Sequence, residues 1–121
     1  MEADRPRRWR DYRTASGRRP VREFLDELSE TDAAAVVAAM RDVAQLGLPA
    51  ARHLRGDIYE VRADGDRQAF RVLFALEGSR GHILLSLEAF SKKTQKTPPA
   101  HIELAQRRLS DWRRRAHLSQ Q

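Results

Sequence analysis

The sequence predicts an α+β domain in which an antiparallel sheet of about four strands carries a helical hairpin and a C-terminal helix. Apolar residues change near Gly56 from the three- and four-residue spacing of helices to the two-residue spacing of strands. Short, turn-rich links separate the strand-like runs, and 121 residues with 40% hydrophobic residues suit one compact core. We therefore expect a single domain over residues 1–121, with a core at about residues 7–115 and the element order β-α-α-β-β-β-α.

The first expected strand is "RRWRDYRT", in which Trp9 and Tyr12 are aromatic residues of the kind that strands favour. A helix is expected from Pro20, because proline fits the first turn of a helix. The apolar stripe of this helix consists of Val21, Phe24, Leu25 and Leu28.

The second expected helix has both start and stop signals. Ser29 or Thr31 can cap its N-terminus, and Gly47 with Pro49 ends it. Its apolar residues recur at helical spacing, and the predicted buried face consists of Ala33, Val36, Val37, Met40, Val43 and Ala44. The two helices should form a hairpin.

Three strand-like runs follow in the second half of the chain. They are "DIYEVRA", "QAFRVLFALE" and "HILLSLEAF", and the links "DGDR" and "GSRG" are short enough to make neighbouring strands antiparallel. Thr97 is the expected N-cap of a last helix that begins at Pro98. The buried stripe of that helix should consist of Ile102, Ala105, Leu109 and Trp112.

The charge balance favours a polyanionic partner such as nucleic acid. Lys and Arg number 23 against 17 Asp and Glu, which gives a net charge of +6. Cysteine is absent, which excludes disulfides and thiolate chemistry, and His82, His101 and His117 lack metal-ligand spacing. We expect no metal, no cofactor and no membrane partner, and a cytoplasmic location, because no signal-peptide core or stretch of roughly 20 apolar residues occurs.

Three lysines stand in a loop, Ser91 to Thr97, just before the last expected helix. Lys92, Lys93 and Lys96 are close to a helix N-terminus, where partial positive charge repels cations and attracts phosphate. A purely structural loop would avoid lysine there, so we interpret the loop as a phosphate-binding segment. The alternative is a solvated turn.

Arg71 interrupts the run "AFRVLF", which is otherwise apolar. An arginine in a half-buried strand costs free energy unless it is paired or faces a groove. Arg71 can therefore face a binding groove, or its guanidinium can pair with Glu60 or Glu88 on the same sheet.

The motifs "LRGDIYEVRA", "FRVLFAL" and "LEAFSKKTQKTPPAHIELAQRR", in this order, resemble those of the RelE/ParE superfamily of bacterial toxins, in its HigB and phage Gp49-like branch. The resemblance spans about residues 7–115 and implies a RelE-like fold. It also implies the toxin of a type II toxin–antitoxin system, which cleaves mRNA on the ribosome without a metal and inhibits translation. The implied partners are the ribosome, mRNA, a cognate helix-turn-helix antitoxin of the HigA type and, in some systems, a SecB-like chaperone.

Carried over to this chain, the family pattern matches three basic residues to catalytic positions, Arg71, Arg62 and Lys93. Lys92 and Lys96 belong to the same loop motif and are expected, with Arg55, to bind RNA phosphates. Phe90 and Ser91 stand where several relatives have a Tyr or His.

His53 is a further candidate for acid–base catalysis, although a lone loop histidine is more often a surface residue. Two other functions remain open from the sequence. A ParE-like protein of the same fold would inhibit DNA gyrase, and a non-catalytic nucleic-acid-binding module would use the same cations as phosphate anchors.

Overall fold

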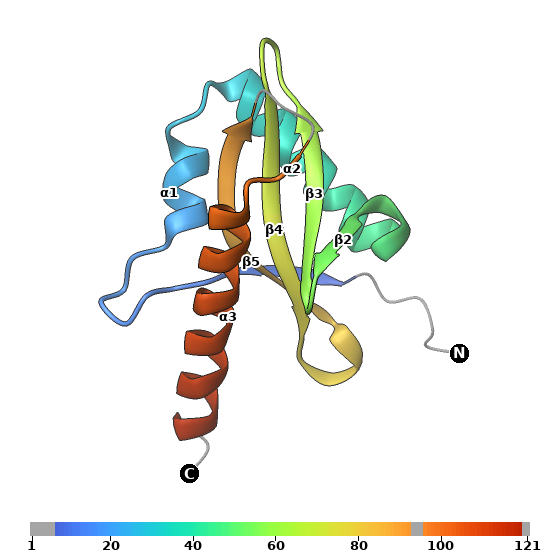
Figure 1. Cartoon of the computed structure of the whole chain (residues 1–121). Coiled ribbons are helices and arrows are strands. Elements are labelled where there is room, and N and C mark those ends of the chain that lie inside the picture. The colour runs from blue at the N-terminus through green and yellow to red at the C-terminus, as the bar shows by residue number, and fades with distance from the viewer. Residues whose placement is uncertain (1–6, 93–95, 120–121) are drawn as a thin grey trace.

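The computed structural model describes residues 7–92 and 96–119. Its five strands form one sheet in the order β1-β5-β4-β3-β2 (Figure 1). The strands are β1 (Arg8–Asp11), β2 (Arg52–Arg55), β3 (Ile58–Asp64), β4 (Ala69–Glu77) and β5 (Ile83–Lys92). The helices are α1 (Pro20–Asp26), α2 (Glu30–Leu46) and α3 (Pro99–Ser119), with short 3-10 turns at Leu48–Ala50 and Ser79–Gly81.

The α+β class and the antiparallel meander of β3, β4 and β5 are confirmed. Two details of the sheet differ from the expectation of about four antiparallel strands. β1 pairs with β5 in parallel, because the chain passes through α1 and α2 before it returns to the sheet. The segment of β2 was expected to be a loop, and in the structure it pairs antiparallel with β3. The sheet is therefore mixed and has five strands.

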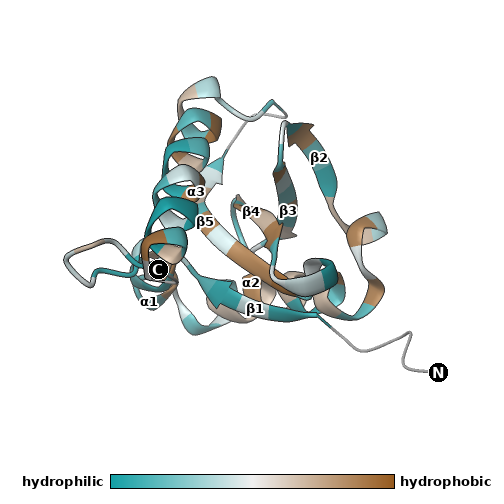
Figure 2. Cartoon of the chain, turned by 90° about the horizontal axis from the view of Figure 1, so that it is seen from below, coloured by the Kyte–Doolittle hydropathy of each residue, from teal (hydrophilic) through white to brown (hydrophobic). Residues whose placement is uncertain are grey.

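The helices cover opposite faces of the sheet, as the view from below shows (Figure 2). On one face α1 and α2 pack over Phe70, Phe74 and other buried residues of the strands. On the other face α3 packs Ala105 and Leu109 against a second cluster, made of Tyr12, Ile58, Leu73, Ala75, Leu85, Leu87 and Phe90. Val37 does not belong to the buried face that was expected for α2, since it is 43% exposed.

Local end signals account for most helix boundaries. Pro20 begins α1, the Ser29 side chain accepts a hydrogen bond from the Asp32 N–H, and Gly47, with φ 83°, follows the last residue of α2. The start of α3 is one residue later than expected, at Pro99. Thr97 is therefore not adjacent to the helix as a cap, and its hydroxyl group contacts the sheet instead.

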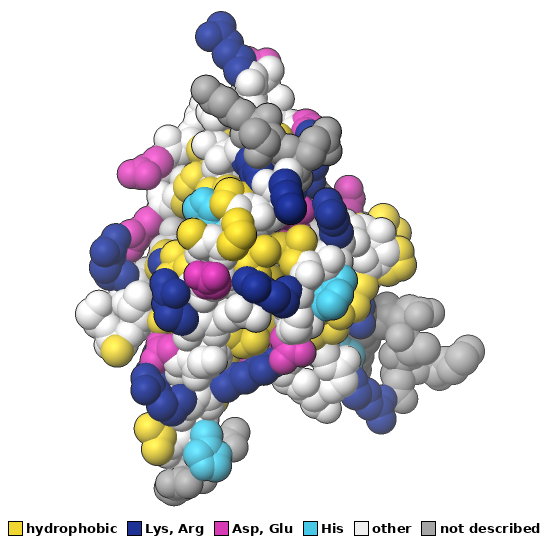
Figure 3. All heavy atoms as spheres, viewed as in Figure 1, with side chains coloured by type: hydrophobic (Ala, Val, Ile, Leu, Met, Phe, Trp, Pro, Cys, Tyr) yellow, Lys and Arg dark blue, Asp and Glu magenta, His cyan; other side chains and the backbone are white. Residues whose placement is uncertain are grey.

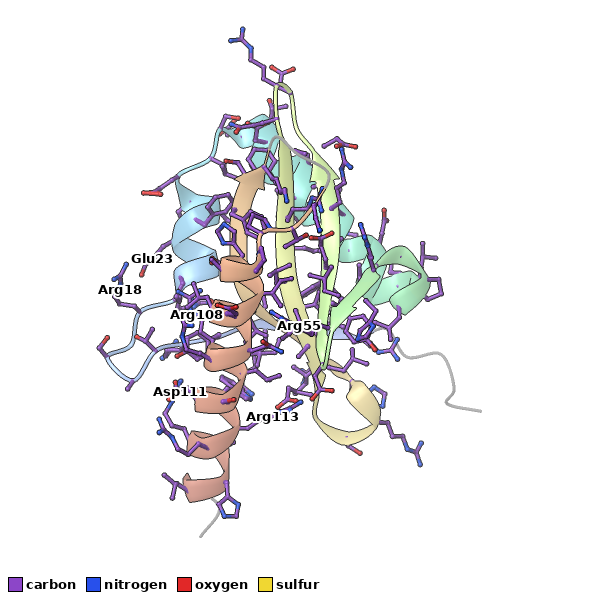
Figure 4. The ribbon with its side chains drawn as sticks, in the orientation of Figure 1. Arg18, Glu23, Arg55, Arg108, Asp111 and Arg113 are labelled. Atoms are coloured by element: carbon purple, nitrogen blue, oxygen red, sulfur yellow. The ribbon has the colours of Figure 1, made fainter. Side chains whose placement is uncertain are left out.

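Polar contacts fix the far half of α3 to the body of the protein. The Tyr12 hydroxyl donates to Asp111, at 2.7 Å, and Arg113 reaches both Asp57 and Glu77 (Figure 4). In the ranges 7–92 and 96–119, no helix has the length and apolar character needed to cross a membrane.

Candidate functional site

A buried polar cluster lies on the α3 face of the sheet, beside the end of the lysine loop. Arg71 Nη1 is 2.7 Å from Glu60 Oε1, and both side chains are only 3% exposed. The Thr97 hydroxyl donates to the other oxygen of Glu60 and accepts a hydrogen bond from Arg71 Nη1, at 3.4 Å. Glu60, one of the two carboxylates predicted as partners of Arg71, thus forms the ion pair with it. The hydrogen bonds of Thr97 connect the end of the loop to this pair.

Strand register brings these residues together. Arg71 of β4 stands directly opposite Arg62 of β3 and Phe90 of β5. Since residues two apart on a strand share a face, Glu60 and Lys92 lie on the same face as these three. Arg71, which interrupts the apolar run of β4, therefore belongs to a patch of charged residues from three neighbouring strands.

Lys92 is the unusual member of this cluster. The side chain is buried, at 7% exposure, and its Nζ has no hydrogen-bond partner among the described residues. Burial lowers the pKa of Lys92, and the nearby positive charge of Arg71 lowers it further, while Glu60 acts in the opposite direction. Two cationic side chains, Arg71 and Lys92, thus lie near the carboxylate of Glu60.

A cleft opens onto the Glu60–Arg71 pair from the side of β2. Its volume is about 190 Å³, and its walls are formed by Ala50, Ala51, Arg52, Glu60, Arg62 and Arg71. The Arg62 side chain is 47% exposed, with a long contact of 3.3 Å to Asp64. Lys and Arg side chains gather on this part of the surface, over β3 and β4 (Figure 3).

Arg52 belongs to the cleft, although it is not among the site residues predicted from the sequence. It stands opposite Glu60 in the pairing of β2 with β3. A strand assignment for "RHLR" would have revealed it, because the two-residue period then places Arg52 on the face of Glu60 and Arg62.

The structure does not bring His53 to this cluster. His53 stands opposite Tyr59, on the other face of the sheet from Arg52 and Glu60, and its ring packs against Tyr59 with centroids 5.1 Å apart. Its Nε2 lies 2.7 Å from the carbonyl oxygen of Gly56. The role expected for His53 would therefore require RNA to reach a different surface.

The remaining predicted residues are spread around the cluster. Arg55 is exposed on β2, on the side of the sheet toward α3 (Figure 4). Lys96 is exposed in the loop that leads to Thr97. Lys93 lies outside the described residues. Within the described ranges, no group of three or more His, Asp and Glu side chains is placed to hold a metal ion.

A mixed sheet with α1 and α2 on one face, a long α3 on the other and a cationic cluster at the end of the last strand defines an α+β protein of the RelE-like class. The family model "Phage derived protein Gp49-like (DUF891)" matches residues 23–110. The chain is also 36% identical over 109 residues to a "Probable endoribonuclease HigB1" of Mycobacterium tuberculosis, found in strains CDC 1551 / Oshkosh and ATCC 25618 / H37Rv. That match covers 88% of this chain and 85% of the relative.

The chain belongs to the phage Gp49-like family, the HigB branch of the RelE/ParE superfamily that its motifs resemble.

Proposed function

We propose that this protein is the toxin of a type II toxin–antitoxin pair and that it cleaves mRNA on the ribosome without a metal ion. The relative that matches most of its length carries the name of an endoribonuclease. The observation that carries the proposal is the buried amine of Lys92, which has no hydrogen-bond partner among the described residues and lies near the Arg71–Glu60 pair. A phosphodiester of RNA would supply an anionic partner for this amine.

In metal-free cleavage of RNA the ribose 2′-hydroxyl attacks the neighbouring phosphorus, and negative charge builds up on the phosphate oxygens. In our proposal Arg71 and Arg62 stabilise that charge from the sheet, together with Lys93 of the loop. Lys92, Lys96 and Arg55 hold adjacent phosphates. The cleft beside Arg62 gives the backbone of the RNA a route to the pair.

The proposal is tested by inducing the protein in cells and mapping mRNA ends. Cuts in phase with codons support it. DNA damage signalling with intact mRNA would indicate a gyrase inhibitor, and neither response would indicate a binding module.

Single-turnover cleavage on programmed ribosomes then tests the assigned residues. Arg62→Ala, Arg71→Ala and Lys93→Ala should each reduce the cleavage rate by roughly a hundredfold or more, because each removes a group that stabilises the transition state. Arg107→Ala is the matched control, since Arg107 is an exposed arginine of α3 that has no part in the proposed site. Circular dichroism checks folding, and Arg62→Ala remains decisive if loss of the buried Arg71 unfolds the chain. Wild-type rates for all three variants would refute the site.

The proposed toxin requires a neutralising partner. We expect a helix-turn-helix antitoxin, encoded next to this protein, to bind it through an acidic or apolar segment, and a SecB-like chaperone to assist in some systems. Co-expression should relieve the growth defect and yield a complex that survives size-exclusion chromatography. Free expression without a growth defect would contradict this proposal.

A further inference from the structure

A histidine and a glutamate form a pair on the α3 face, next to the cationic cluster. His101 lies in the first turn of α3, and its ring stacks on Phe90 with centroids 3.7 Å apart and planes 4° apart. Its Nδ1 is 2.8 Å from Glu88 Oε2. None of the roles proposed above uses either residue.

The Glu88 carboxylate is itself held in place. Its Oε1 accepts hydrogen bonds from Arg108 Nη1, at 3.2 Å, and from the Ala89 N–H, at 3.1 Å. Arg108 Nη1 also donates to the Leu87 carbonyl oxygen, at 2.7 Å. With Oε1 engaged in this way, Oε2 is directed to the imidazole.

This arrangement selects one tautomer of neutral His101. A carboxylate accepts the Nδ1 proton, so the lone pair of the ring is on Nε2. The side chain is 33% exposed, which leaves the ring accessible to a substrate. A histidine oriented by a carboxylate, with its second nitrogen available, is the arrangement that general bases use.

The His101 ring is close to the cluster proposed to bind phosphate. Phe90, on which it stacks, stands directly opposite Arg71 in the pairing of β4 with β5. Residues opposite each other in such a pair have Cβ atoms roughly 5 Å apart. Thr97, four residues before His101, bonds to both Arg71 and Glu60 and fixes the start of α3 relative to the pair.

We propose that His101 is the general base of RNA cleavage, with Glu88 as its positioning residue. In this step Nε2 takes the proton of the 2′-hydroxyl while the 2′-oxygen forms its bond to phosphorus. The bond from phosphorus to the 5′-oxygen breaks, and the 5′-oxygen keeps the electron pair and receives a proton from water. The products are a 2′,3′-cyclic phosphate and a 5′-hydroxyl end. This inference rests on the proposed endoribonuclease function.

Single-turnover cleavage on programmed ribosomes tests the inference. His101→Gln should reduce the cleavage rate by about a hundredfold to ten-thousandfold, the usual contribution of a general base. His82→Gln, at an exposed histidine just before β5, should cleave at the wild-type rate. Added imidazole should restore part of the activity of His101→Gly, and it should not affect Arg62→Ala.

A second variant tests the positioning role of Glu88. The charged groups that face His101 are Glu88 of β5 and Arg108 of α3, with Arg71 and Lys92 on the strands beyond Phe90. Glu88→Gln should lower the cleavage rate of the folded protein, because the imidazole loses the carboxylate that orients it.

The outcomes are distinct. If the wild-type protein cleaves no mRNA, the proposed function fails and this inference fails with it. If the wild type cleaves and His101→Gln cleaves equally well, only the inference is overturned. Should His101→Gln be unfolded by circular dichroism, the imidazole response of His101→Gly and the cleavage rate of Glu88→Gln decide the question.

Discussion

Replacing Lys92 with methionine should stabilise the protein and impair its activity. The amine of Lys92 is buried without a hydrogen-bond partner among the described residues, and Arg71 is a second cation beside it. Methionine has a similar length and no polar atom to desolvate. Since a buried unsatisfied polar group costs about 1–3 kcal/mol, Lys92→Met should raise the free energy of unfolding by about that amount at pH 7.

The pH dependence follows from the direction of the pKa shift. The pKa of Lys92 is lowered from 10.5, mainly by burial, so the unfolded chain binds this proton more tightly than the folded protein. The cost of burying Lys92 is therefore present in full below the lowered pKa, and it diminishes as the pH rises toward 10.5. The advantage of Lys92→Met should diminish over the same range.

Urea titrations of wild type, Lys92→Met and Lys96→Met at pH 7 and pH 10.5 measure both effects. Lys96 is an exposed lysine of the loop that follows β5, so its variant should stay within about 0.5 kcal/mol of the wild type. In parallel, Lys92→Met should bind programmed ribosomes more weakly and with a smaller salt dependence. A Lys92→Met variant that is less stable than the wild type at pH 7 would refute the reasoning.

Three further predictions concern stability. Glu60→Gln removes the carboxylate charge that pairs with the buried Arg71 and should lower the free energy of unfolding by about 3–5 kcal/mol in urea titrations, whereas an unchanged midpoint would show that this ion pair does not stabilise the fold. Hydrogen bonds, chiefly that from Tyr12, lower the pKa of Asp111 from 3.8 to about 2, so its stabilising effect is complete above pH 3.8 and disappears as the pH falls through about 2. Melting temperatures of wild type and Asp111→Asn should therefore differ near neutral pH and converge near pH 2, and a constant difference would be inconsistent with this. Phe74→Ala removes a ring of 0% exposure from the core. Because the site is well packed, this variant should lower the free energy of unfolding by about 3–5 kcal/mol in the same urea titrations.

The fold was predictable where the signals are local. Pro20, Ser29 and Gly47 act within one helical turn, and the structure confirms the boundaries that they indicated. The pairing of β1 with β5 was not predictable from such signals, because the paired residues, such as Arg8 and Ile83, are 75 positions apart in the sequence. β2 was missed for a similar reason, since "RHLR" has no alternating pattern and is a strand only through its pairing with β3.

The candidate site was predictable to the level of residue type. Arg71 stood out as an arginine in an apolar run, and both of its possible partners were carboxylates on the expected sheet. The choice of Glu60 depends on strand register and on the Thr97 contact, which single-residue patterns do not encode. His101 gave no signal, because its contacts with Phe90 and Glu88 arise only when α3 packs on β5.

The parallel pairing of β1 with β5 has a consequence for synthesis. Ribosomes release the N-terminal strand first, yet Arg8 pairs with Ile83 and Asp11 with Ser86. At the usual rate of elongation, a nascent β1 waits roughly 4 to 15 s for its neighbour. The sheet, and with it the proposed cleavage site, is completed only after β5 has been made as far as Lys92. A partner that recognises the completed sheet therefore has nothing to bind before that point.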